Sequence, residues 1–159
     1  MNDDVALFVS AYSAADEHRI RFAWNGKHAE EFRDSNMDFR KAVRRVVLSD
    51  IDAAPIELVR DLFKAETECS REAWGINRGV DVMAERLLRS DPERFVEDYL
   101  TGKFQSFDAH LGSAFPTDSE IAARLLEIVQ RRLSENPSDD RRELLVKGRE
   151  LFEGWLNSN

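Results

Sequence analysis

Three histidines, His18, His28 and His110, are the side chains best suited to metal binding or proton transfer. A helical di-iron site needs a glutamate three positions before each histidine, so that carboxylate and imidazole share one helix face. Alanine, asparagine and phenylalanine occupy those positions, and no two histidines have the four-residue spacing of a zinc hydrolase. His18 and His28 could meet across a helical hairpin, but no ligand motif accompanies them. The sequence predicts no metal site and no cofactor.

Cys69 is the single cysteine, so no disulfide can form within the chain. It lies in an expected helix between Glu68 and Glu72. A nucleophilic cysteine needs a positive environment that lowers its pKa, and carboxylates have the opposite effect. We therefore expect Cys69 to be a buried structural thiol.

Two carboxylate pairs, Glu57 with Asp61 and Glu68 with Glu72, are each spaced by one helical turn. Such pairs can act as general acid and base when burial separates their pKa values. Basic residues at helical spacing surround both pairs, which is typical of a solvated, charged face. We expect no catalytic residue among them.

Arg40, Lys41, Arg44 and Arg45 form a basic cluster. We place it on a helix over 28–48, opposite a hydrophobic stripe that includes Val43. A cluster of this kind could bind phosphates. The formal net charge of -8 argues against nucleic acid as a partner. Nucleic-acid binding through Arg40–Arg45 is kept as a second alternative function.

The segment 102–116 contains three of the ten phenylalanines, bordered by glycines. Phe104, Phe107 and Leu111 share one helical face, which is either part of the core or a partner-docking surface. Residues 80–120 contain four basic and nine acidic residues, so a basic partner is favoured. The residues that we expect to contact a partner are Phe104, Phe107, His110, Phe115, Glu97, Asp98 and Asp108.

A pocket between helices is the alternative site, and would belong to a small-ligand or metal-dependent enzyme or sensor. The loop 74–79 contains two glycines, but their spacing does not match that of a phosphate-binding loop. The polar and aromatic residues that could line such a pocket are Tyr12, His18, Trp74, Asn77 and Tyr99.

The composition is that of an ordinary folded protein. The 159 residues are 42% hydrophobic and 34% charged, enough for a single domain over 1–159. No apolar stretch approaches the ~20 residues of a membrane helix. The N-terminus lacks a secretory signal, so we expect a cytoplasmic protein with no membrane partner.

Hydrophobic periodicity predicts an all-α fold, a compact bundle or orthogonal array of about six to seven helices. Thr117 to Glu120 has the spacing of a capping box. Gly148, in the interior of the last helix, predicts a close helix crossing. We expect helices over 3–24, 28–48, 54–74, 80–89 and 92–100, one starting after Thr117, and one starting near Ser138.

These observations favour a non-enzymatic cytoplasmic protein–protein interaction module, such as a regulator, an adaptor or an immunity-type inhibitor. It would dock through the acidic, aromatic-containing surface around 80–120. The partner would be another protein, with a basic one favoured by the acidic surface, or a second copy of the chain.

Overall fold

The computed structural model describes residues 3–73, 75–113 and 118–158. They fold as an all-α protein, and the described ranges contain no strand. Two short 3-10 helices, η1 and η2, lie within the first fifty residues. The elements are α1 (Asp3–Ser10), η1 (Ala14–Arg19), η2 (Ala29–Glu31), α2 (Met37–Ser49), α3 (Ile56–Glu72), α4 (Val80–Ser90), α5 (Pro92–Lys103), α6 (Phe107–Gly112), α7 (Ser119–Ser134) and α8 (Asp139–Ser158).

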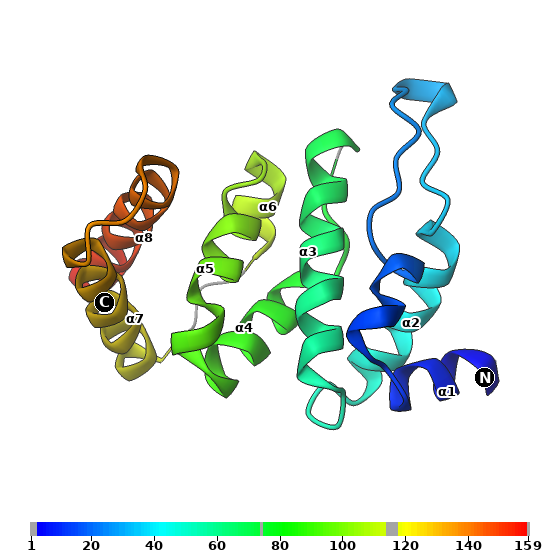
Figure 1. The fold of residues 1–159 in the computed structure, drawn as a ribbon, viewed down its shortest axis with the longest axis horizontal. Helices are drawn as coiled ribbons and strands as arrows, with labels where there is room; N and C mark the ends of the chain where they lie inside the picture. The colour runs from blue at the N-terminus through cyan, green and yellow to red at the C-terminus, as the bar shows by residue number, and fades with distance from the viewer. Residues whose placement is uncertain (1–2, 74, 114–117, 159) are drawn as a thin grey trace.

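The helices follow one another along the long axis of the molecule (Figure 1). α1 and α2 pack together at one end, and the hairpin of α7 and α8 forms the other. α3 stands between α2 and α5, with α4 packed against both α3 and α5. The two sides of α3 therefore face different neighbouring helices.

The helices from α3 onward lie close to the predicted ranges, because their hydrophobic spacing and capping residues agree. Asp91 caps α5 by accepting a hydrogen bond from the Arg94 N–H, and Pro92 occupies the first turn. One cap was wrongly predicted. Asp118, rather than Thr117, caps α7, with its carboxylate accepting from two backbone N–H groups. Thr117 lies outside the described residues.

The prediction of two long helices over the first fifty residues is wrong. α1 ends at Ser10, and η1 begins after Ser13, whose backbone N–H and hydroxyl both donate to Asp16 Oδ2 at 3.1 and 2.7 Å. Residues 21–35, which we call the arm, then project from the body as two facing segments (Figure 1). The second helix starts only at Met37, directly after Asn36, and so begins nine residues later than predicted.

Aromatic side chains hold the two segments of the arm together. The ring of Phe22 stacks on Phe32 at a centroid distance of 6.3 Å and on Trp24 at 6.5 Å. The Asn25 N–H donates to the Arg33 carbonyl at 3.0 Å. The hydrophobic spacing that favoured a long helix therefore reflects contacts across the arm.

The core runs through the helical row, with residues of α2, α3, α4, α5, α7 and α8 fully buried. The close crossing predicted at Gly148 is confirmed. A Cβ atom at this position would lie 2.5 Å from Leu100 Cδ1, so α8 approaches α5 as closely as only glycine allows.

Candidate functional site

The predicted partner-binding segment folds as α6 with its flanks. Phe107 is 75% exposed and Leu111 is 66% exposed, and they lie one helical turn apart. Phe104 is half-buried, and its ring stacks on His110 at 5.7 Å. Phe115 lies outside the described residues. The structure thus places two large apolar side chains of this segment in solvent.

α6 is fixed to the body on its inner side. Ser106 caps it by accepting from the Ala109 N–H, and the Ser106 hydroxyl is hydrogen-bonded to that of Ser70 on α3 at 2.9 Å. Asp108 Oδ2 accepts from the Gly75 N–H at 2.9 Å. These contacts hold the exposed pair on a firm support, which reduces the conformational entropy lost when a partner binds.

A buried lysine lies beneath α6. Lys103 Nζ donates to the carbonyl oxygens of His110 and Ser113, both at 2.8 Å. The cation satisfies carbonyls at the C-terminal end of the helix, where the helix dipole is negative. Burial lowers the pKa of Lys103 to about 8. Burial and the charge of Lys103 also lower the pKa of His110, so the imidazole is uncharged at neutral pH.

An acidic groove leads from α6 along the boundary of α3 and α5. It has a volume of about 220 Å³, and Gln105, next to the cap of α6, lies at its edge. Asp98 has no ion-pair partner within the described ranges. We call this groove, lined by three carboxylates and one lysine, the acidic groove; its charged residues are Lys64, Glu68, Glu97 and Asp98.

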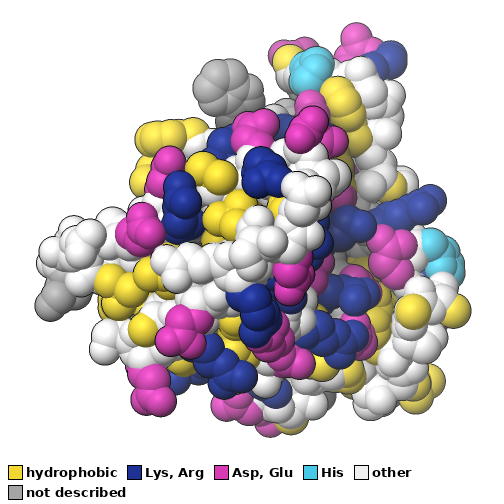
Figure 2. All heavy atoms as spheres, turned by 60° about the vertical axis from the view of Figure 1, so that its left-hand side comes forward, with side chains coloured by type: hydrophobic (Ala, Val, Ile, Leu, Met, Phe, Trp, Pro, Cys, Tyr) yellow, Lys and Arg dark blue, Asp and Glu magenta, His cyan; other side chains and the backbone are white. Residues whose placement is uncertain are grey.

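Part of the acidic charge expected on 80–120 is neutralised inside the fold. Glu97 is held by Arg132 and, at 2.6 Å, by Arg141, and the hydrogen bond from Arg141 lowers the pKa of Glu97. Glu93 pairs with Arg131 at 2.6 Å. Figure 2 shows basic and acidic side chains interspersed over the face that includes α7 and α8. Fewer acidic side chains of 80–120 are therefore unpaired at the surface than the sequence indicates.

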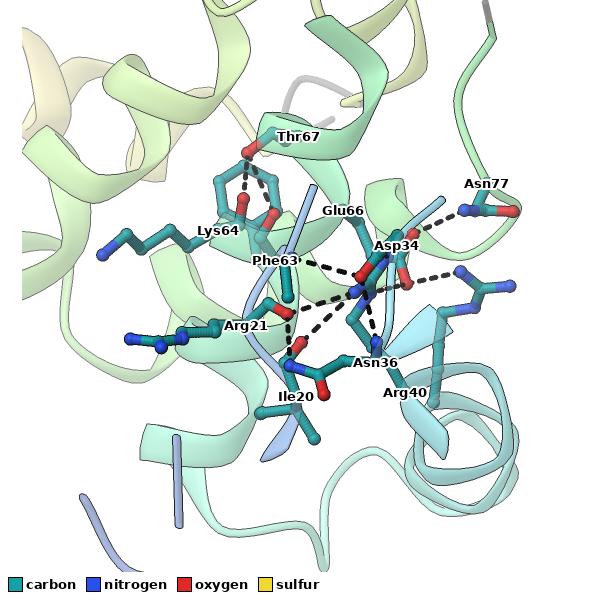
Figure 3. A network of polar contacts seen from close by, with 12 residues as sticks. Ile20, Arg21, Asp34, Asn36, Arg40, Phe63, Lys64, Glu66, Thr67 and Asn77 are labelled. Atoms are coloured by element: carbon teal, nitrogen blue, oxygen red, sulfur yellow. Dashed lines mark hydrogen bonds and ion pairs between the residues drawn. The ribbon is translucent and has the colours of Figure 1, made fainter. Parts of the chain in front are cut away.

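The opposite side of α3 carries a buried ion network (Figure 3). Arg40 is 1% exposed and donates to Asp34 Oδ2 at 2.6 Å and to Glu66 Oε1 at 3.3 Å. Arg44 pairs with the same Glu66 oxygen at 2.6 Å, and Asn77 Nδ2 donates to Glu66 Oε2 at 2.5 Å. Two buried carboxylates thus meet two guanidinium groups.

This network corrects the predicted basic cluster. Arg40 points into the protein, so the helix face opposite the hydrophobic stripe is not uniformly solvated. Burial alone would lower the pKa of Arg40, but the hydrogen bond to Asp34 and the charges of Glu66 and Asp34 outweigh it and raise the pKa. This arrangement leaves no signal in the sequence, because Glu66 lies 26 positions from Arg40.

The carboxylate pair of Glu57 and Asp61 is also not the solvated pair that was expected. Asp61 is buried, accepts from the Tyr12 hydroxyl at 2.7 Å and pairs with Arg60 at 2.8 Å. Burial and the hydrogen bond to Asp61 raise the pKa of Tyr12, so this tyrosine remains protonated. Cys69 is buried as predicted, and burial raises its pKa.

The predicted pocket residues that the structure describes do not come together. Tyr12 bonds to Asp61, Asn77 bonds to Glu66, and the ring of Tyr99 stacks on Phe63 in the core at 6.4 Å. His18 Nδ1 lies 2.8 Å from the carbonyl of the neighbouring Ala15. Trp74 lies outside the described residues. His28, the suggested partner of His18, instead contacts Trp24 on the arm.

No group of three or more histidine, cysteine, aspartate or glutamate residues within the described ranges could hold a metal ion. None of the described helices is both long enough and apolar enough to cross a membrane. No family model, no curated protein and no solved structure matches this chain. Its function must therefore be argued from its surfaces.

Proposed function

We propose that the protein is a non-enzymatic interaction module whose exposed α6 pair, Phe107 and Leu111, docks into a partner protein. The main support for this proposal is that both side chains are largely exposed to solvent. Burying a large apolar side chain in a partner is worth about 1.5–3 kcal/mol, and aromatic anchors of this kind often dominate binding energies.

Charge favours a basic protein over a second copy of the chain. The formal net charge is -8, so two copies repel each other at low ionic strength. The acidic groove ends at Gln105, two positions before Phe107. A basic segment of the partner could occupy this groove while apolar residues cover α6, which combines electrostatic steering with hydrophobic anchoring.

The test uses a control that the chain itself provides. Leu7 is 66% exposed, the same fraction as Leu111, and lies on α1 at one end of the helical row, whereas α6 lies near the middle. Immobilised wild type, Leu7→Ala and the double variant Phe107→Ala/Leu111→Ala are incubated with lysate, and bound proteins are quantified by mass spectrometry.

The proposal requires a basic protein that wild type and Leu7→Ala retain and the double variant loses. Its retention should fall as salt is raised. Equal recovery on all three baits contradicts docking through α6. Concentration-dependent association of the purified chain in light scattering, abolished by the double variant, would instead identify a second copy as the occupant.

A further inference from the structure

A second groove, of opposite charge, lies between α2 and the loop 75–79. It consists of two adjoining cavities of about 290 and 370 Å³, both lined by Lys41 and Arg44. The larger one is also lined by Arg45 and Arg78, and has no acidic residue in its lining. We call this the basic groove.

The basic groove and the acidic groove use different faces of α3. Glu66, Ser70 and Ala73 face the basic groove, whereas Lys64 and Glu68 face the acidic groove. Positions two apart on a helix point in nearly opposite directions. The two sites are therefore independent, and one can fail its test without affecting the other.

The basic groove contains more cations than the carboxylates that pair with them. Arg40 and Arg44 are balanced by Asp34 and Glu66. Three further cations line the basic groove: Lys41, Arg45 and Arg78. All three are exposed, and none forms an ion pair with another described residue. The local excess is positive although the chain as a whole is strongly negative.

The fold holds these cations together at a cost. Lys41 and Arg45 are four positions apart on α2, a like-charge spacing that destabilises a helix. Gly79 has a φ of 88°, and a Cβ there would lie 2.3 Å from Leu48 Cδ1. This tight contact keeps the neighbouring Arg78 beside α2. A multivalent anion would relieve the repulsion.

We propose that the basic groove binds a small anion that carries a pyrophosphate group. Guanidinium groups match phosphate oxygens with paired, charge-assisted hydrogen bonds, and several cations suit a ligand with adjacent phosphates. The smaller cavity, walled by Met37, Ala73 and Ile76, leaves room for an organic part of the ligand. Nucleic acid is disfavoured because the groove is small and the chain as a whole carries a formal net charge of -8.

The test is isothermal titration calorimetry of the whole chain with inorganic pyrophosphate. Lys41→Gln/Arg78→Gln removes two exposed cations and leaves the buried network intact, so binding should weaken by at least about tenfold. Arg124→Gln, on α7, removes an exposed charge elsewhere and should change the affinity by less than about twofold. Arg45→Gln serves as a second groove variant if the double variant does not fold.

Saturable binding that the groove variants lose and Arg124→Gln retains would support the proposal. Absence of binding at millimolar pyrophosphate, or equal weakening by Arg124→Gln, overturns it. Tighter binding of a 20-nucleotide single strand than of pyrophosphate would overturn it in favour of nucleic acid.

Discussion

The guanidinium group of Arg40 lies 2.6 Å from the carboxylate of Asp34, and both side chains are almost completely buried. Asp34 stands where the arm returns to the body, and Arg40 lies on α2. Arg40 Nη1 also approaches the Ile20 and Arg21 carbonyls at 3.4 Å, where the arm begins. A single arginine therefore joins both ends of the arm to the helical row.

Arg40→Met should destabilise the protein by about 3–5 kcal/mol, because it leaves the Asp34 carboxylate buried without its partner. Urea denaturation followed by circular dichroism measures the change. Lys41→Met, at the exposed neighbouring position, should stay within about 0.5 kcal/mol of wild type. Trypsin should cut the arm after Lys27 and Arg33 faster in Arg40→Met than in wild type. Equal stability of the two variants would show that the ion pair does not anchor the arm.

Substituting alanine for the two glycines of α8 should change the stability of the protein in opposite directions. Gly148→Ala places a Cβ 2.5 Å from Leu100, and overpacking should cost about 1–3 kcal/mol. Gly154→Ala meets no atom within 4 Å, and should stabilise the helix by about 0.5–1 kcal/mol. Thermal unfolding of both variants checks the pair. A Gly148→Ala protein as stable as wild type would contradict the close α5–α8 crossing.

Lys103 should make stability rise with pH in mildly alkaline solution. Its folded-state pKa is about 8, below the ordinary value of about 10.4, so between these values the unfolded chain binds more protons. Stability therefore increases with pH through this interval. Relative to Lys103→Met, wild type should gain up to about 3 kcal/mol between pH 7.5 and about 10.5.

The comparison with Lys103→Met is needed because the cysteine and tyrosine groups of the unfolded chain titrate in the same interval in both proteins. Urea midpoints at several pH values give the two curves. Parallel curves would mean that the Lys103 ammonium is not desolvated beneath α6.

Sequence patterns sufficed for the helices whose formation depends on local signals. α3, α4, α5, α7 and α8 each have a hydrophobic face of helical period, α5 is also capped by Asp91, and each of these helices forms near its expected position. Local preference and tertiary packing agree there. Gly148 was informative for a related reason, because an interior glycine that costs helix stability needs a packing explanation.

The arm could not be inferred, because Phe22 and Phe32 each continue the hydrophobic spacing of a neighbouring stretch, within 3–24 and within 28–48. The two rings stack across the arm, and a contact between two separately predicted helices leaves no periodic signal in the sequence. The structure interrupts the two long helices at Ser13, which pairs with Asp16, and at Ser35-Asn36, directly before α2.

The candidate sites depended even more on tertiary structure. The spacing of Phe107 and Leu111 placed them on one helical face, but whether they lie in the core or in solvent is decided by how α6 rests on Ser70 and Gly75. The separation of Arg40 from Lys41 and Arg45 likewise depends on where Glu66 arrives from α3. Residue types indicated the chemistry, and packing determined which charges remain available.

The central claim is that Phe107 and Leu111 are the anchors of a protein complex. The most direct measurement is calorimetric titration of the purified partner into wild type, Phe107→Ala, Leu111→Ala and Leu7→Ala. Loss of a buried aromatic anchor costs about 2 kcal/mol or more, so Phe107→Ala should weaken binding by at least about 30-fold, with a smaller loss for Leu111→Ala. Leu7→Ala should bind as wild type does. An unchanged dissociation constant for Phe107→Ala would contradict docking through α6.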